Sequence, residues 1–194
     1  MKRPPIALGL CLVLTTAGCG GASSDGAAST ATASTTAAST SSSASLKAVP
    51  HEKLTELLPT IPGWKRESEP RGDTDTTVNV SRVQVDYVQE GSSGAGLSIE
   101  MMDMASNSGM LALIRESLKR QGTWKTADGS TQKSLTVADY PATEEWTPGA
   151  GNGTVSVLLS DRFVVTVTGS TVGNVGVIHK VFESIDLKKI ASLK

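Results

Sequence analysis

Acid–base or nucleophilic catalysis in this chain would have to involve one of only two histidines, His51 and His179. A serine, threonine or cysteine nucleophile needs a base beside it, usually a histidine oriented by a carboxylate. His51 lies at the start of the folded part, where we expect it to be solvated. His179 lies between Ile178 and Lys180 on a predicted helix, one position away from the buried stripe. A boundary or exposed position is the favoured interpretation of His179, so the sequence assembles no catalytic set.

Acidic residues offer a second kind of chemistry, which is metal ligation or carboxylate-assisted hydrolysis. Glu100 and Asp103 lie three residues apart in a predicted strand, so their side chains point to opposite faces and are poorly placed to share an ion. The adjacent pair Glu144 and Glu145 is more typical of solvated charges at a sheet edge. We therefore expect no metal or other cofactor. An envelope hydrolase or metal-dependent enzyme that uses Asp103, His179 or the Glu144/Glu145 pair remains the alternative to a non-enzymatic function.

Glycine-rich stretches do not indicate a phosphate site. The stretch "TPGAGNGT", from Thr147 to Thr154, lacks the spacing of a phosphate-binding loop, and a predicted strand follows it where a helix would be required. We interpret it as a hairpin loop.

Flexible and aromatic apolar side chains are the remaining candidates for binding. Methionines adapt their shape to line a groove, and an exposed tryptophan ring offers a flat surface to a protein or a glycan. The candidate ligand contacts are Met101, Met102, Met104, Trp64, Trp124 and Trp146. For each of them, burial in the core or at its edge is the favoured interpretation.

The first residues predict where the protein works. Lys2 and Arg3 precede an apolar stretch from Ile6 to Leu14, which is too short to cross a hydrocarbon layer of roughly 30 Å as a helix. Small residues follow, and then Cys19. A basic start, a short apolar segment and small residues in this order are typical of a secretory signal peptide.

The residues Ala17, Gly18 and Cys19 resemble the lipobox of bacterial lipoproteins, although Thr16 stands where leucine is usual. The resemblance implies cleavage before Cys19 and acylation of its thiol, with palmitate-type chains anchoring the protein on the extracytoplasmic side of the cell membrane or the outer membrane. The alternative is ordinary cleavage after Ala17, which leaves Cys19 as a free thiol. The only other cysteine, Cys11, lies in the discarded segment, so the mature chain forms no internal disulfide.

Residues 22–45 predict a disordered tether. All of them except Asp25 and Gly26 are alanine, serine or threonine, and none is a large apolar residue that could offset the entropy lost on ordering. As a flexible coil the tether has a root-mean-square span of about 25–30 Å. The predicted organisation is therefore a signal peptide over residues 1–18, a lipidated N-terminus and tether over residues 19–45, and a single domain over residues 46–194.

Charge excludes one class of partner. The formal net charge is −1, it becomes more negative once Lys2 and Arg3 are removed, and no cluster of lysines and arginines appears. Nucleic acid and anionic surfaces are therefore not expected as partners.

Hydrophobic periodicity along residues 46–194 predicts an α+β domain. We expect helices over residues 51–58, 108–120 and 174–184, strands over residues 83–87, 97–101, 132–137 and 142–146, and a hairpin of residues 155–159 and 163–167. Val78 and Val80 are out of phase with Val83 and Val85, which predicts a bulge near Ser81. Short turns between strands predict an antiparallel sheet, with two main helices on one or both faces. This order is similar to that of Mog1/PsbP-like proteins, a fold found in some bacterial lipoproteins.

The sequence therefore favours a membrane-anchored lipoprotein of the cell envelope whose domain binds a protein partner or an apolar ligand without catalysis. A structural spacer is a third possibility, and the lack of an apolar pocket or patch would identify it. The enzymatic alternative requires His179 and a carboxylate within hydrogen-bond distance inside a cleft.

Overall fold

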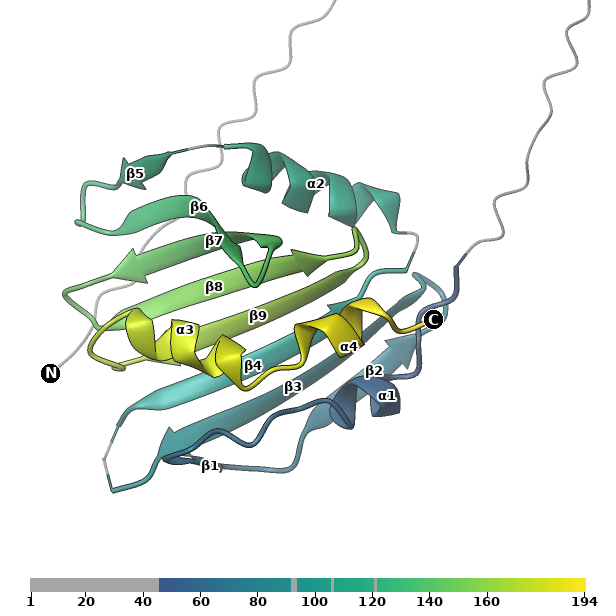
Figure 1. Ribbon diagram of the computed structural model, residues 1–194, viewed down its shortest axis with the longest axis horizontal. Coiled ribbons are helices and arrows are strands. Elements are labelled where there is room, and N and C mark those ends of the chain that lie inside the picture. Colours follow the sequence, from purple (N-terminus) through teal and green to yellow (C-terminus); the bar gives the residue numbers. More distant parts are fainter. Residues whose placement is uncertain (1–45, 92–93, 106, 121) are drawn as a thin grey trace, which may run out of the picture. The chain divides into compact units, whose positions relative to one another are not determined.

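The computed structural model describes residues 46–91, 94–105, 107–120 and 122–194, so the predicted signal peptide, Cys19 and the tether lie outside the described residues. Within the described part, nine strands form one antiparallel sheet and four helices accompany it (Figure 1). The strands are β1 (Trp64–Arg66), β2 (Arg71–Asp75), β3 (Val80–Gln89), β4 (Gly96–Asp103), β5 (Thr123–Lys125), β6 (Thr131–Val137), β7 (Tyr140–Thr147), β8 (Asn152–Leu159) and β9 (Phe163–Ser170), and the helices are α1 (His51–Thr55), α2 (Ser108–Lys119), α3 (Gly176–Glu183) and α4 (Leu187–Ala191).

The strand order is β1-β3-β4-β9-β8-β7-β6-β5, and β2 pairs with β3 alongside β1. The predicted antiparallel sheet with helices packed on it is therefore confirmed. The β8–β9 hairpin forms where the alternating valines predict it. Its turn residues Ser160 and Asp161 have φ values of +49° and +53°, the left-handed values that a type I′ hairpin turn requires.

The bulge expected near Ser81 is wrong. Ser81 pairs with Thr74 on one side and Asp103 on the other, in registers that continue without a slip along β3. Val78 precedes β3 and is 52% exposed, so it does not share the burial pattern of the strand. Its apparent change of phase marks the turn between β2 and β3.

One face of the sheet carries the main hydrophobic core. Alternate residues such as Val83, Ile99, Val155 and Val165 are fully buried on this face. Helices α1, α3 and α4 cover it, and they contribute further buried side chains that include Leu54, Ile178, Phe182, Leu187 and Ile190. Figure 1 shows α3 and α4 in front of the central strands. The helix predicted over residues 174–184 forms as α3, and α4 follows it as a separate helix that Asp186 caps by accepting a hydrogen bond from the backbone N–H of Lys189 at 2.9 Å.

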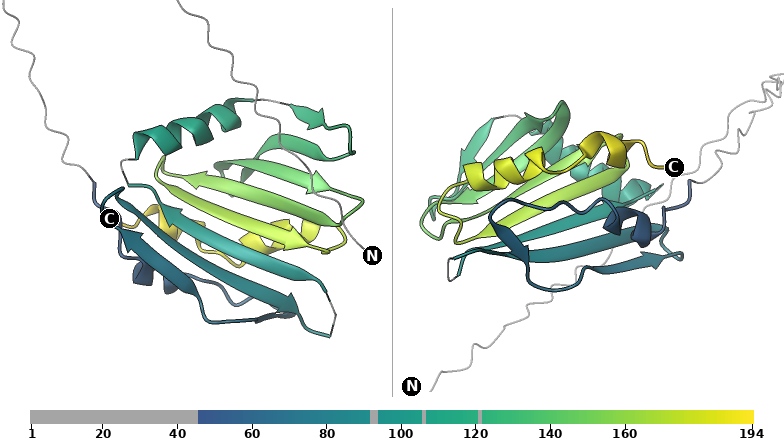
Figure 2. Two further views of the ribbon diagram at one scale, coloured as in Figure 1. Left: turned by 180° about the vertical axis from the view of Figure 1, so that it is seen from behind. Right: turned by 60° about the horizontal axis from the view of Figure 1, so that its bottom comes forward.

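The opposite face of the sheet is mostly polar, and α2 is the one helix of the described residues that lies on it. Asn107 caps this helix by accepting a hydrogen bond from the backbone N–H of Met110 at 3.2 Å. Leu111 then packs with Met104, Leu158 and Val164 in a second, smaller apolar cluster. Seen from behind in Figure 2 (left), α2 lies toward the β5–β7 end of the sheet, while β3, β4 and β9 carry no helix on this face. The two longest helices therefore lie on opposite faces.

None of the helices in the described part of the chain is both long enough and apolar enough to cross a membrane.

Candidate ligand-binding groove beneath helix α2

Two adjoining hollows lie between α2 and the polar face of the sheet. The first has a volume of about 260 Å³ and the second a volume of about 190 Å³. Both are lined by Ser117, Thr143 and Ser156, so they form one continuous depression, which we call the α2 groove. Its apolar end is lined by Met102, Ile114, Leu118, Leu158 and Val164, and its polar end by Arg120, Trp124, Gln132, Lys133, Ser134, Glu144, Glu145 and Thr154.

The groove exists because α2 packs closely against the sheet at only one of its ends. Leu111, in the first turns, is 4% exposed and fills the second apolar cluster. Ile114 and Leu118 continue the same helical stripe but remain half-buried. Their apolar side chains are therefore exposed to the groove instead of being packed tightly against the strands.

The register of the sheet arranges the floor of the groove in three rows across the strands. The apolar row is Leu158, Val164 and Met102, which pair across β8, β9 and β4. The hydroxyl row is Ser134, Thr143 and Ser156, which pair across β6, β7 and β8. The charged row is Trp124, Gln132 and Glu145, which pair across β5, β6 and β7. Neighbouring rows are two residues apart along a strand, which is about 7 Å.

Two opposite charges in the polar end have no partner among the residues that the structure describes. Neither the guanidinium of Arg120 nor the carboxylate of Glu145 forms a hydrogen bond or an ion pair with any other described residue. The backbone carbonyl of Arg120 accepts a hydrogen bond from the Ser134 hydroxyl at 2.5 Å, which fixes the end of α2 over the hydroxyl row. Trp124 is 39% exposed, so its ring is open to solvent in the same hollow. The polar end therefore presents a cation, an anion and an aromatic face.

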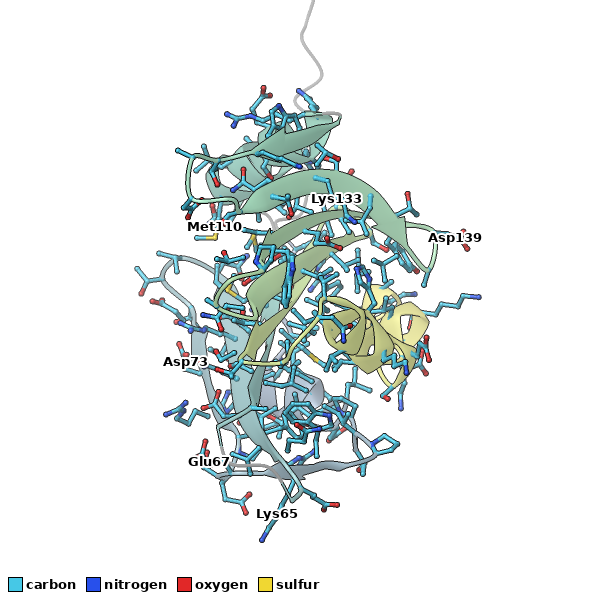
Figure 3. The ribbon with its side chains drawn as sticks, turned by 90° about the vertical axis from the view of Figure 1, so that its left-hand side faces the viewer. Lys65, Glu67, Asp73, Met110, Lys133 and Asp139 are labelled. Carbon is cyan, nitrogen blue, oxygen red and sulfur yellow. The ribbon has the colours of Figure 1, made fainter. Side chains whose placement is uncertain are left out.

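A separate polar cluster lies on the main-core face, between β7 and α3. The Glu144 carboxylate is 4% exposed, accepts a hydrogen bond from His179 Nε2 at 2.6 Å and forms an ion pair with Lys133 Nζ at 3.0 Å. Glu144 and Glu145 point to opposite faces because consecutive strand residues alternate. Figure 3 shows Lys133 toward the α3 side of the sheet and Met110 toward the other. The expectation that Glu144 is a solvated edge charge is wrong, because β6 and β8 flank β7 and α3 covers this face.

The Glu144–His179 pair meets only half of the requirement for catalysis. A carboxylate bonded to one imidazole nitrogen orients the ring, and the other nitrogen would then act on a nucleophile or a substrate. His179 is 32% exposed and borders none of the hollows described here, and no hydroxyl or thiol of the described residues forms a hydrogen bond with its ring. The cluster ties α3 to β7.

Asp103, a residue of the enzymatic alternative, is fully buried and forms a bidentate pair with Arg162 at 2.8 and 2.7 Å. The same carboxylate accepts hydrogen bonds from the backbone N–H groups of Val49 and Ala105, both at 2.7 Å. Arg162 also donates to the backbone carbonyl of Lys47 at 2.9 Å. All the polar atoms of Asp103 are therefore engaged in holding the first described residues against the end of the sheet.

The predicted contact residues fall into three environments. Met101 belongs to the main core and Met104 to the second cluster, and both are at most 1% exposed. Trp146 packs against the main core, and Trp64 lines a different hollow beside Val177 of α3. Met102 and Trp124 line the α2 groove, at its apolar and polar ends. The sequence offers no signal for Arg120, Ser117 or Glu145 as members of one site, because only the strand register and the position of α2 bring them together.

His51 is half-buried at the start of α1, where its backbone N–H donates to the Thr74 hydroxyl at 2.9 Å. Within the described residues, no three histidine, cysteine, aspartate or glutamate side chains come together in a metal-binding arrangement.

No protein-family model, curated protein or solved structure matches this chain. Its function has to be argued from the groove itself.

Proposed function

We propose that this protein is a lipoprotein of the cell envelope, anchored through acylated Cys19 on the extracytoplasmic side of a membrane, and that its domain binds a small amphipathic ligand in the α2 groove without transforming it. The observation that carries the proposal is the graded lining of one continuous groove, which passes from an apolar row to a hydroxyl row and then to a charged row.

The lining and size of the groove support binding of a small molecule. The two hollows together fall within the range of about 300–1,000 Å³ that is usual for small-molecule sites, which combine apolar walls with a few polar groups. An apolar chain placed between Ile114, Leu118 and the apolar row would gain roughly 25 cal/mol for each Å² of apolar surface removed from water. The hydroxyls of Ser117, Thr143 and Ser156 would then provide hydrogen bonds for the polar part of the ligand.

Binding is favoured over catalysis because the reactive groups and the groove lie on opposite faces. The Glu144–His179 pair faces α3, and Asp103 is engaged by Arg162 and two backbone N–H groups. Although Glu144 borders the polar end of the groove, its carboxylate is directed to His179 and Lys133, and neither His179 nor Asp103 lines the groove. A purely structural spacer is also disfavoured, since it has no need of a groove with half-buried apolar walls.

The proposal is tested by filling the groove from the helix side. Ser117 lies on α2 and borders both hollows, so Ser117→Trp places an indole between the apolar and polar ends. The matched control is Leu113→Trp, which makes the same replacement on the same helix at a side chain that is 74% exposed. Every residue of both apolar cores lies between Val49 and Leu193, so the chain from residue 19, with Cys19→Ser to prevent oxidation, is suitable for these measurements.

The readout is the fluorescence of a dansyl-labelled fatty acid titrated with each variant. We expect saturable binding to the parent chain, unchanged binding to Leu113→Trp, and an affinity at least about tenfold lower for Ser117→Trp, equivalent to about 1.4 kcal/mol. Equal binding by Ser117→Trp and the parent chain, or no binding by the parent chain, would overturn the proposal.

A further inference from the structure

We infer that the ligand of the α2 groove is a single-chain zwitterionic amphiphile with a phosphate followed by an ammonium group, as in a lysophosphatidylethanolamine. This inference rests on the proposed function, because it names the class of molecule that the groove would hold. It is drawn from the order of the chemical groups along the groove and from the two charges there that have no partner in the described part of the chain.

The order of the rows matches the order of groups in such a molecule. The apolar row lies under Ile114 and Leu118, where an acyl chain would be held. The hydroxyl row comes next and presents hydrogen-bonding groups to an ester and a glycerol hydroxyl. The charged row follows about 7 Å further along the strands. A molecule laid along the groove with its chain under α2 therefore places its head group beside Arg120, Trp124 and Glu145.

Two features of the charged row favour a cation. The Glu145 carboxylate has no partner among the described residues, and it lies in the same row as the half-open ring of Trp124, with only Gln132 between them. A tryptophan face attracts an ammonium group, and a carboxylate pairs with it.

Arg120 provides the complementary site for an anion. Its side chain begins at the end of α2, directly above the hydroxyl row, because its carbonyl accepts the hydrogen bond from Ser134. A guanidinium binds a phosphate through paired hydrogen bonds, and Arg120 has no carboxylate partner in the described part of the protein that would have to be displaced. The anion site therefore precedes the cation site along the groove, as phosphate precedes ammonium in the head group.

The test compares three probes that share a lauroyl chain, each below its critical micelle concentration, in isothermal titration calorimetry. Lauroyl lysophosphatidylethanolamine carries both charges, lauroyl lysophosphatidylglycerol carries only the phosphate, and monolaurin carries neither. The variants are Arg120→Gln and Glu145→Gln, and the control is Glu183→Gln, which removes an exposed carboxylate from α3 on the other face. Arg120 and Glu145 are exposed, so we expect both variants to remain folded.

We expect the ethanolamine probe to bind most tightly and monolaurin most weakly. Glu145→Gln should lower the affinity for lauroyl lysophosphatidylethanolamine about five- to tenfold and change the affinity for lauroyl lysophosphatidylglycerol by less than about twofold. Arg120→Gln should lower the affinity for both phosphate-containing probes about five- to tenfold and leave the affinity for monolaurin unchanged. Glu183→Gln should change nothing.

Equal affinity for the three probes, or no probe-specific loss in Glu145→Gln, would overturn this inference while leaving the proposed groove intact. Tighter binding of a two-chain phosphatidylethanolamine in nanodiscs than of the single-chain probe would overturn the claim that the ligand has a single acyl chain. Failure of every probe and of the dansyl-labelled fatty acid would overturn the proposed function as well.

Discussion

The buried pair of Asp103 and Arg162 gives a stability prediction whose size follows from the contacts. Replacing Arg162 by methionine keeps the length of the aliphatic stem but removes the guanidinium. Asp103, which is fully buried, would then keep only its hydrogen bonds from the Val49 and Ala105 backbone N–H groups. The Lys47 carbonyl would also lose the Arg162 hydrogen bond of 2.9 Å.

Removing one partner of a buried ion pair leaves an uncompensated charge and costs about 3–5 kcal/mol. The free energy of unfolding of a domain is about 5–15 kcal/mol, so Arg162→Met should remove about a third of it if the total lies near the middle of this range. For a domain of this size, the midpoint of thermal unfolding shifts by about 2–4 °C for each kcal/mol, which gives a decrease of roughly 6–20 °C.

The assay is urea unfolding followed by circular dichroism, supported by the thermal midpoint. The matched control is Arg71→Met, which removes the guanidinium from a pair with Asp86 at 2.6 Å whose arginine side chain is 68% exposed. Exposed pairs contribute about 0–1 kcal/mol, so the control should lie within 1 kcal/mol of the parent chain. If Arg162→Met is no more destabilising than Arg71→Met, the assignment of Asp103 as a structural carboxylate is refuted.

Three other predictions concern separate parts of the protein. Burial raises the pKa of Tyr87, whose hydroxyl donates a hydrogen bond to the Pro59 carbonyl at 2.7 Å. The neutral tyrosine therefore contributes its full stabilisation below about pH 10, and this stabilisation is lost as the pH rises through the folded-state pKa of Tyr87. Urea unfolding at about pH 9 and about pH 11 should therefore show a larger loss for the parent chain than for Tyr87→Phe, and equal losses would contradict this origin. Cys19→Ala should abolish incorporation of labelled palmitate and release the protein from membranes, whereas retention of both would exclude Cys19 as the anchor. Glu144→Gln should lower the free energy of unfolding by about 1–3 kcal/mol and leave binding in the α2 groove unchanged, and a loss of binding in a folded variant would connect the His179 cluster to the ligand.

Strong local patterns in the sequence predict the central strands and the long helices well. The alternating residues of β8 and β9 have one interpretation, and their hairpin lies where it is expected. Strands β1, β2 and β5 are not predicted, because segments such as Arg71–Asp75 and Thr123–Lys125 are short and polar and are ordered by pairing with a neighbouring strand. Their formation depends on contacts that are distant in sequence.

The candidate site could be predicted only in fragments for the same reason. Trp124 and Met102 are recognisable as possible contacts from residue type alone. Glu145 is not distinguishable from Glu144 in the sequence, although one faces the groove and the other faces α3. The difference depends on strand phase and on which helix covers each face. Two of the partners of Asp103, Arg162 and Val49, are likewise 59 and 54 residues away along the chain, a separation that no local pattern indicates.

The most direct test of the central claim is a methyl NMR titration of the chain from residue 19, carrying Cys19→Ser, with lauroyl lysophosphatidylethanolamine. We predict shifts of the methyl signals of four residues that line the groove, at probe concentrations that leave the main-core methyl groups unchanged. These residues are Ile114, Leu118, Leu158 and Val164. Shifts confined to the side of the sheet that α3 covers, with the groove methyl groups unaffected, would contradict the central claim.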